Sequence, residues 1–536
     1  MKKLFFSKLI FCILFTSSLQ SQNEVRIVKE LGPGAENGLT DDAQIIGTVA
    51  NSILIADSGN FITSNGTDLG TVISGELGEG GRILHHKTTL NDKLYFLLEN
   101  ETEDFQLMEF DPFSGSINTI LSGYDNISNL IAYNGKLYCS AEGNDEDDAF
   151  ISIDLSTGNI ETIFELNSFG GMRDVAIHNN LIYTIHWSAT QDGAYLASSD
   201  GTPGNVNEFY FFHDGSDFSQ GRTINMTSAD ENLFMWYDNG PDNYTLFVSD
   251  GTASGTLELS NSFVPISFFD IEANRGIGTL GNKIFFRGEV EGDSDENLWV
   301  SDGTISGTFP ILIDGELEVK PRFFTTLNDK IYFNGAHTNS SFGAISGAMV
   351  SDGTESGTKR LFQGGNHPED FNNDGWHIIT HQNKLFFAAN NSLHANELYA
   401  SDGTLDGTER LSTIGQENEF SSVFNLRSAG ENLFFFGNFD ASGRELYIYG
   451  PTTSSIYNIV DHSLDVFPNP VDNILNINSD FKNVDQIEIY DFEGKLVKTF
   501  LQPNRRTLDV QDLTQGSYLL KVRQRQDIST SKFMKL

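Results

Sequence analysis

The sequence repeats one short pattern nine times, and this repetition restricts the fold more than any other feature. A polar or glycine-containing pair precedes a run of apolar and aromatic residues, as in NDKLYF from Asn91 and NDKIYF from Asn328. The copies lie about 40 to 54 residues apart and begin at Asn51, Asn91, Asn134, Asn179, Glu231, Gly281, Asn328, Gln382 and Glu431. Because they are rich in aromatic and β-branched residues and lack helical spacing, this period favours an all-β propeller over a helical solenoid.

Each repeat has material for four strands, which is the content of one propeller blade. Several strands are apolar on both faces, as at Leu298, Trp299 and Val300, and this suits sheets that pack face to face. We therefore expect a β-propeller of about eight or nine four-stranded blades over residues 22–460, with a string of small β-sandwiches as the alternative. The strand VRIVKEL at Val25 is expected to close the ring by pairing with the last blade.

A second pattern, Ser-Asp-Gly-Thr, ends one strand in many of the repeats. It begins at Ser199, Ser249, Ser301, Ser351 and Ser401, with the variant SNGT at Ser64. Asp-Gly is a strong turn pair, because the carboxylate accepts backbone N–H groups and glycine adopts positive φ without steric cost. Other repeats replace the pattern with different turn formers, as in DPFSGSINTI at Asp111. We interpret the pattern as a structural turn, and a ring of ligand-contacting loops is the alternative.

Together the two patterns resemble the ELWxxDGT-type repeat of exported bacterial proteins, sometimes called hyalin-like. The residues that carry this resemblance best are LWVSDGT from Leu298 to Thr304 and ELYASDGT from Glu397 to Thr404. The resemblance covers roughly residues 25–460. It implies a repeat scaffold and brings no catalytic residues to assign.

The first 21 residues have the three regions of a secretory signal peptide. A basic start with Lys2, Lys3 and Lys8 precedes a short apolar run and a small, polar tail, and we expect cleavage near Ser21. The apolar run is too short to span a membrane, and no later segment reaches the roughly 20 apolar residues that a spanning helix needs. The sequence therefore predicts export without a transmembrane segment.

Cysteine and charge describe the exported chain further. Removal of Cys12 with the signal leaves Cys139 unable to form an internal disulfide, and its KLYCSA context predicts a small buried strand residue. Residues 462–536 hold 10 Lys and Arg and 10 Asp and Glu, whereas residues 22–461 hold 20 and 64. So acidic a surface repels nucleic acid and anionic lipid. We expect no nucleic-acid partner.

The last 70 or so residues have a different pattern, with short strands of alternating polarity and turns at Glu493-Gly494 and Gln515-Gly516. This pattern predicts a small immunoglobulin-like β-sandwich over residues 461–536. This segment closely resembles the type A C-terminal sorting domain of the type IX secretion system of Bacteroidota. The matching positions are Pro468, Asn469, Pro470, Tyr490, Asp491, Gly494, Gly516, Tyr518, Lys532, Phe533 and Lys535. The resemblance implies passage through the periplasm and the outer membrane, with the secretion machinery and its sortase-like peptidase as partners.

Departures from the repeat are where a ligand site is expected, and the sharpest is DFNNDGWH. Asp370, Asn372 and Asp374 alternate before a glycine, as oxygen ligands do in half of a calcium loop. The twelfth position is His381 instead of Glu, so a polar turn is the alternative to a calcium site. Trp376 and His377, in the same irregular segment, are candidate ligand contacts. The other tryptophans, Trp187, Trp236 and Trp299, lie in apolar strands and are expected in the core.

These observations predict an exported cell-surface or secreted scaffold for binding or adhesion, with an extracellular glycan or protein as ligand. It requires no cofactor, and calcium is the one candidate ion. We assign no catalytic residues. The rival is a propeller enzyme, a hydrolase or lyase acting on extracellular polysaccharide, which would need paired carboxylates or a Tyr, His and Arg cluster on one face of the ring.

Overall fold

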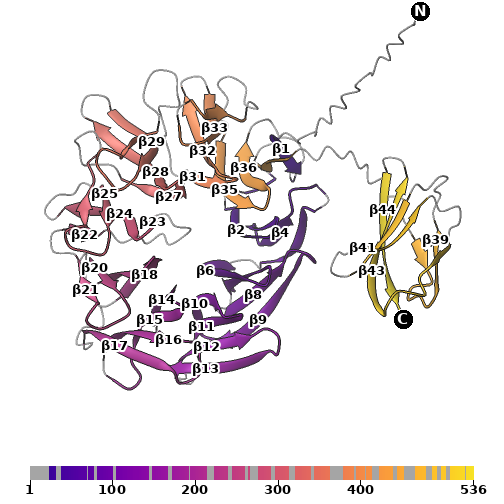
Figure 1. The fold of residues 1–536 in the computed structure, drawn as a ribbon, viewed down its shortest axis with the longest axis horizontal. Helices are drawn as coiled ribbons and strands as arrows, with labels where there is room; N and C mark the ends of the chain where they lie inside the picture. The colour runs from indigo at the N-terminus through magenta and orange to yellow at the C-terminus, as the bar shows by residue number, and fades with distance from the viewer. Residues whose placement is uncertain are drawn as a thin grey trace, which may run out of the picture. The chain divides into compact units, whose positions relative to one another are not determined.

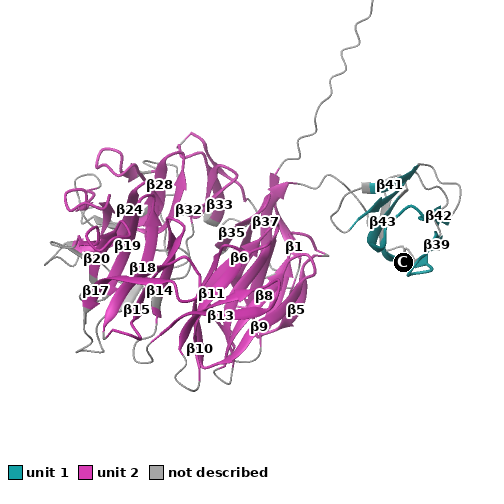
Figure 2. Ribbon diagram, turned by 60° about the horizontal axis from the view of Figure 1, so that its bottom comes forward, with its two compact units in different colours: residues 1–22, 452–536 teal, residues 23–451 magenta. Residues whose placement is uncertain are grey.

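The structure is a computed structural model that divides into two compact units. Residues 23–451 form one unit, and residues 452–536 together with residues 1–22 form the other (Figure 2). The structure describes residues 23–536 except for residues 30, 32–37, 41, 69, 78–80, 101–103, 144–147, 167–171, 192, 214–221, 239–243, 260–262, 266–275, 291–295, 313–319, 340–342, 362–377, 392–393, 405, 413–421, 439–443, 452–464, 479–485, 492–495, 502–506 and 525–526.

The described residues of the larger unit form nine antiparallel sheets, eight of four strands and one of five. The first four sheets are β2 (Gln44–Val49), β3 (Ser52–Asp57), β4 (Asn60–Ser64) and β5 (Val72–Glu76); β6 (Arg82–Leu90), β7 (Lys93–Glu99), β8 (Phe105–Asp111) and β9 (Ser116–Tyr124); β10 (Asn126–Tyr133), β11 (Lys136–Glu142), β12 (Ala149–Asp154) and β13 (Asn159–Glu165); and β14 (Met172–His178), β15 (Leu181–Trp187), β16 (Ala194–Ser199) and β17 (Val206–His213).

The next five sheets continue in the same order. They are β18 (Arg222–Ala229), β19 (Asn232–Asp238), β20 (Tyr244–Ser249) and β21 (Leu257–Glu258); β22 (Phe263–Pro265) and β23 (Ile277–Leu280) with β24 (Lys283–Val290), β25 (Glu296–Ser301) and β26 (Phe309–Pro310); β27 (Arg322–Leu327), β28 (Lys330–Asn339), β29 (Gly343–Ser351) and β30 (Lys359–Arg360); β31 (Ile378–His381), β32 (Lys384–Asn391), β33 (His394–Ser401) and β34 (Thr408–Arg410); and β35 (Ser422–Ala429), β36 (Asn432–Asn438), β37 (Glu445–Pro451) and β1 (Asn23–Lys29).

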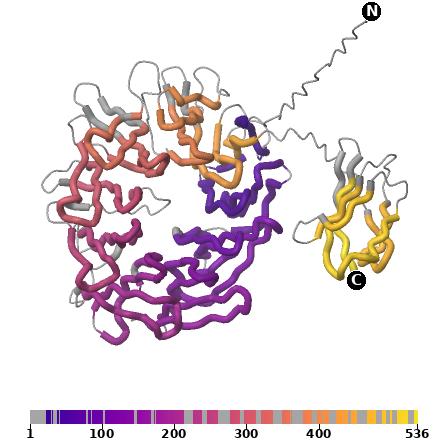
Figure 3. The backbone as a smooth tube through the Cα atoms, viewed as in Figure 1, coloured from indigo at the N-terminus to yellow at the C-terminus, as the bar shows by residue number. Residues whose placement is uncertain are grey.

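The nine sheets follow one another around a circle, and the trace of residues 23–451 returns to its starting point (Figures 1 and 3). The ring closes as the strand at Val25 predicts, because β1 pairs antiparallel with β37, from Asn23 opposite Pro451 to Lys29 opposite Leu446. The ninth sheet thus combines the first strand of the unit with its last three. The fold is all-β and propeller-like, not a string of separate sandwiches.

The core lies between the sheets. Nine apolar clusters each join two neighbouring sheets, and one of them joins the ninth sheet to the first through Phe434, Phe436, Ile53 and Ile55. Both faces of a sheet are therefore buried, since Trp299 packs in the cluster shared with the fifth sheet and Leu298 in the cluster shared with the seventh. Trp187, Trp236 and Trp299 are all buried, as their apolar strands predict.

The ninefold sequence pattern is the turn between the first two strands of each sheet and the buried strand that follows it. Every one of the nine turns has a residue with positive φ at its first position, for example Asn91, Asn328 and Gly430. Asparagine and glycine tolerate this conformation, which matches the right-handed twist of the strands they join.

The free thiol of Cys139 is buried in the second strand of the third sheet, and burial raises its pKa to about 12.

The Ser-Asp-Gly-Thr pattern forms a turn whose polar groups bind one another. In the copy at Ser301, the N–H of Thr304 donates to Asp302 Oδ1 at 2.9 Å and its hydroxyl donates to the same atom at 2.7 Å. Ser301 Oγ accepts the N–H of Gly303 at 3.2 Å and lies 2.7 Å from Thr308 Oγ1. The N–H of Gly307 donates to Thr304 Oγ1 at 2.9 Å. The carboxylate and hydroxyls are thus used within the turn.

Two substitutions of Asp250 should distinguish the contribution of its negative charge to stability from the contribution of its hydrogen-bond acceptor oxygen. Hydrogen bonds from Thr252 hold the pKa of Asp250 below its usual value, so their stabilisation is present above the unfolded-state pKa and is lost as pH falls through the folded-state pKa. We expect Asp250→Ala to cost about 1 kcal/mol at pH 7. Asp250→Asn should cost less, because Asn65 accepts the same two bonds in the first sheet.

Chemical denaturation of both variants and the unmodified chain at pH 7 and pH 3 tests this prediction. The difference between the unmodified chain and Asp250→Ala should shrink at pH 3. An equal difference at both pH values would show that the carboxylate has no special part in the turn.

The smaller unit has two antiparallel sheets around one core. One sheet contains β38 (Asp465–Phe467), β39 (Ile474–Asn478) and β42 (Thr507–Asp509), and the other contains β41 (Leu496–Leu501), β40 (Gln486–Tyr490), β43 (Gly516–Gln524) and β44 (Asp527–Lys535) in that order. Leu475, Ile487, Leu508, Leu520 and Phe533 are among the buried residues between them.

A search of the described residues finds no helix long and apolar enough to cross a membrane.

Candidate functional site

Antiparallel pairing sorts the connections of the ring into two sets. The turn between the first and second strands of a sheet and the turn between its third and fourth strands lie at the same end of that sheet. We call this end of the ring the turn face. Neighbouring sheets meet there, since Tyr138 Oη, beside the turn of the third sheet, donates to the carbonyl oxygen of Gly201 in the fourth at 3.4 Å. β30 ends and β31 begins at the opposite end of the ring.

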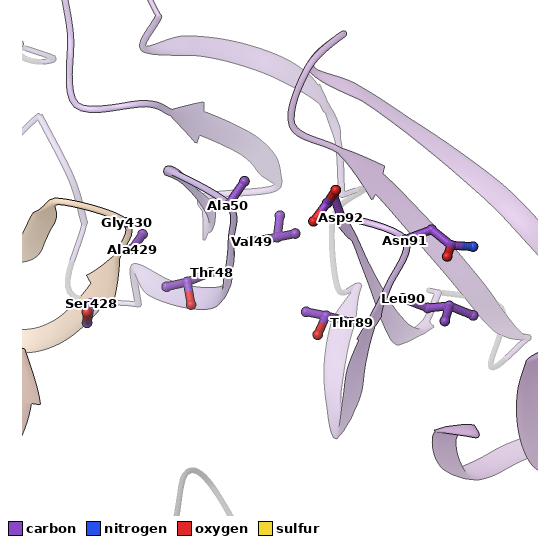
Figure 4. A pocket seen from close by; sticks show the side chains of 10 residues that line it. All are labelled: Thr48, Val49, Ala50, Thr89, Leu90, Asn91, Asp92, Ser428, Ala429 and Gly430. Atoms are coloured by element: carbon purple, nitrogen blue, oxygen red, sulfur yellow. The ribbon is translucent and has the colours of Figure 1, made fainter. Parts of the chain in front are cut away.

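A pocket of about 390 Å³ opens on the turn face where the ninth, first and second sheets meet (Figure 4). It is lined by the ends of β2, β6 and β35 and the turns that follow them. The lining residues are Thr48, Val49, Ala50, Thr89, Leu90, Asn91, Asp92, Ser428, Ala429 and Gly430. Hydroxyls, a carboxylate and an amide thus share one concave site with small apolar side chains.

Three of these hydroxyls occupy the same position in their strands. Thr48, Thr89 and Ser428 each stand two residues before the turn, and Ser228, Thr279, Thr326 and Thr380 fill this position in four other sheets. Where the neighbouring sheet offers a partner, the hydroxyl joins the two sheets. Thr380 Oγ1 donates to the carbonyl oxygen of Thr326 at 2.8 Å.

Two histidines also hydrogen-bond to serines at this strand position in the neighbouring sheet. His178 Nδ1 lies 2.9 Å from Ser228 Oγ, and His381 Nδ1 lies 2.8 Å from Ser428 Oγ. Burial lowers the pKa of both imidazoles below the usual value, so the uncharged ring is favoured at each junction. His381 is thus a buried contact between the eighth and ninth sheets, and its position suits packing better than a surface ligand site.

A second pocket, of about 880 Å³, lies on the smaller unit and brings together many of the residues that resemble a sorting signal. Asn469, Tyr490, Asp491, Tyr518, Lys532 and Phe533 line it, together with Ser517, Leu519, Lys521 and Met534. Leu519 and Met534 are 36% and 50% exposed, so apolar surface is open to solvent beside two lysines. The pocket combines an apolar floor with charged margins.

Asn469 fixes the segment before β39 to the last strand. Its side-chain amide donates to the carbonyl oxygen of Lys532 at 3.1 Å and accepts the N–H of Met534 at 2.9 Å. Val471 continues the contact, because its N–H donates to the carbonyl oxygen of Met534 at 2.7 Å. These hydrogen bonds join the Pro-Asn-Pro element to the final Lys-Phe-Met-Lys element.

Aromatic and charged contacts order the rest of this pocket. Tyr518 stacks on Phe533 with ring centroids 5.6 Å apart, and its hydroxyl donates to the carbonyl oxygen of Thr514 at 2.8 Å. Lys521 Nζ lies 5.9 Å from the centroid of the Tyr490 ring and 3.7 Å from Glu488 Oε2. These contacts hold the side chains in place without filling the pocket.

The remaining predicted sorting residues lie around this site. Pro468 and Pro470 flank Asn469, and Gly516 pairs with Lys535 across β43 and β44. Lys535 is buried, and its Nζ donates to a main-chain oxygen of Leu536 at 2.8 Å. Gly494 lies outside the described residues.

The predicted calcium ligands Asp370, Asn372 and Asp374 and the predicted contacts Trp376 and His377 also lie outside the described residues, so these stay predictions. Within the described part of the chain, no group of three or more His, Cys, Asp or Glu side chains is placed to hold a metal ion.

Sequence reasoning missed the residues of the turn-face pocket. One sequence feature does point to the pocket. The hexapeptide TTLNDK occurs twice, at Thr88 and at Thr325, and its first copy lines the pocket. Sequence reasoning also missed Leu519, Lys521 and Met534, whose shared face depends on the register of β43 and β44.

Residues 465–535 match a family model described as the secretion system C-terminal sorting domain. This is the sorting domain of type IX secretion, and it indicates export to the cell surface or secretion. The match confirms the resemblance of the last residues to a sorting domain. No curated protein matches the chain.

Solved structures give weak likenesses. The β-propeller domain of the Trilobed protease from Pyrococcus furiosus is 12% identical, with 63% of this chain and 99% of that chain covered and a TM-score of 0.35. BamB from Moraxella catarrhalis is 11% identical, with 69% and 98% covered and a TM-score of 0.34. A prolyl endopeptidase is 8% identical, with 83% of this chain and 55% of that chain covered and a TM-score of 0.38. At such TM-scores these likenesses carry no argument about function.

Proposed function

We propose that this chain is an exported binding or adhesion scaffold, built as a nine-bladed propeller and delivered by an immunoglobulin-like sorting domain. The observation that carries the proposal is the joining of a sorting domain at residues 465–535 to a separate compact ring. A signal peptide at residues 1–21 would bring the chain to the periplasm, and the sorting domain would direct it onward.

The chemistry of the ring supports binding over catalysis. Its repeated polar motif is used in turn hydrogen bonds, and a pocket on the turn face is lined by three hydroxyls and Asp92. Such an arrangement can exchange hydrogen bonds with a ligand. An extracellular glycan is the ligand class that we favour.

Export is tested by deletion of residues 465–536 in the native host. The truncated chain should accumulate in the periplasm, and its amount at the surface or in the medium should fall by at least about tenfold, because the machinery has lost its address. The matched control is Asp92→Asn in the full chain, which alters an exposed turn of the ring and should leave export unchanged. Undiminished surface display of the truncated chain would contradict the proposal.

Binding is tested by applying the purified full chain to a glycan array. We expect binding to a set of related glycans, without release of shorter sugars when the same glycans are incubated with the protein. Release of sugars would favour the alternative, an enzyme that acts on polysaccharide. Absence of binding to every glycan would count against the binding function.

A further inference from the structure

We propose that the turn-face pocket is a subsite for one terminal sugar residue that is neutral or carries an amine. The inference rests on the proposed binding function and deepens it, because it names a site and a ligand class. It starts from the meeting of the ninth, first and second sheets, where the ring is closed.

The hydroxyls of this pocket are available to a ligand. Among the described residues, no side chain or backbone group hydrogen-bonds to the hydroxyl of Thr48 or Thr89, whereas the equivalent Thr380 uses its hydroxyl to join two sheets. Ser428 Oγ has one neighbour, His381 Nδ1, and an oxygen of this kind can take part in a further hydrogen bond. Three hydroxyls at equivalent positions therefore line one pocket (Figure 4).

Asp92 supplies the only charge among the lining residues. The next residue, Lys93, is engaged elsewhere, because its Nζ lies 2.8 Å from Glu109 Oε1 and 3.5 Å from Asp111 Oδ2. The carboxylate is therefore not neutralised by the lysine beside it. An ammonium group or a sugar hydroxyl would find an acceptor there, and an anionic ligand would be repelled.

The size and the polarity of the lining narrow the ligand further. A volume of about 390 Å³ is at the small end of ligand pockets, which suits one sugar unit better than an extended chain. Val49 and Ala429 are buried core residues, and Leu90 packs against the cluster between the second and third sheets. The lining that a ligand can reach is therefore mainly polar, which suits the hydroxyls of a sugar.

The chain contains its own control for this site. The hexapeptide TTLNDK forms the end of β6 and the following turn at Thr88–Lys93, and it forms the end of β27 and the following turn at Thr325–Lys330. Thr89 and Asp92 line the pocket, whereas Thr326 and Asp329 do not. Substitutions at the two copies should have similar effects on folding and different effects on binding.

The test titrates the full chain with glucosamine, glucose and glucuronate by isothermal calorimetry. We expect binding in the order glucosamine, glucose, glucuronate. Thr89→Val should weaken glucosamine and glucose about tenfold, since a ligand hydrogen bond is lost. Asp92→Asn should remove the preference for glucosamine over glucose, because the amide keeps an acceptor oxygen and loses the charge. Thr326→Val and Asp329→Asn should bind all three sugars as the unmodified chain does.

Two results would overturn the inference. One is failure of every sugar to bind at tens of millimolar, and the other is equal weakening by Thr89→Val and Thr326→Val. Glycan-array binding separates this failure from failure of the proposed function. If Thr89→Val and Asp92→Asn bind the array as the unmodified chain does, the ring binds glycans at another site and only the present inference falls.

Discussion

A chain that lacks residues 23–29 should lose about 4 to 7 kcal/mol of unfolding free energy and melt at a lower temperature than the full chain. Those residues form β1, whose pairing with β37 completes the ninth sheet and whose Val28 is buried in the cluster between the ninth and first sheets. Several backbone hydrogen bonds at about 1 kcal/mol each and one buried valine give this size. The unpaired edge of β37 should also promote association of the truncated chains.

Calorimetry and size-exclusion chromatography of the purified proteins measure both effects. The control is a chain that ends at Pro451 and so lacks residues 452–536, which belong to the other compact unit. Its ring should melt as in the full chain. Equal melting temperatures for the chain without β1 and the full chain would show that the closing strand is dispensable.

Gly251→Ala should cost about 2 to 4 kcal/mol, more than the same change at a neighbouring turn. Gly251 has a φ of 90°, and a Cβ at this position would collide with the hydroxyl oxygen of Tyr183 in the preceding sheet. Gly204 also has positive φ, at 75°, but a Cβ there would meet nothing within 4 Å. Gly204→Ala should therefore cost only the backbone strain, about 1 kcal/mol.

A double-mutant cycle separates the collision from the strain. Tyr183→Phe removes the hydroxyl, and the next ring atom would be 3.5 Å from the new Cβ, which is ordinary contact. Tyr183→Phe should therefore restore part of the stability lost in Gly251→Ala, with a coupling of about 1 to 2 kcal/mol from chemical denaturation. Additive effects in the cycle would mean that the two sheets do not press together at this turn.

The periodic part of the fold could be predicted, because the sequence of each repeat contains both the turn-forming residues and the apolar strand that follows them. The nine strands after the turns, the buried tryptophans and the closing role of the strand at Val25 all follow from local pattern and chain order. One detail differs from a simple count of repeats. A strand such as RFFTTL, which ends one repeat in the sequence, is β27, the first strand of the next sheet, so the sheets are offset from the repeats by one strand.

The candidate sites were harder to predict, because their residues meet only through the closed ring or through strand register. Thr89 and Ser428 belong to the second and ninth sheets, and no local pattern places them in one pocket. In the smaller unit, the motif positions could be identified, but the two bonds from Asn469 to β44 depend on how the segment before β39 lies against the last strand. Local sequence fixes neither contact.

The order of the last elements has a consequence for quality control. The strand that receives β1 is β37, and the sorting domain begins only 14 residues after Pro451, at Asp465. A chain cut short by premature termination anywhere in the ring loses the address for export together with the means of closing the ring. A chain shortened in this way lacks the sorting domain whenever its ring is incomplete, so we expect incomplete rings to be retained in the cell that made them.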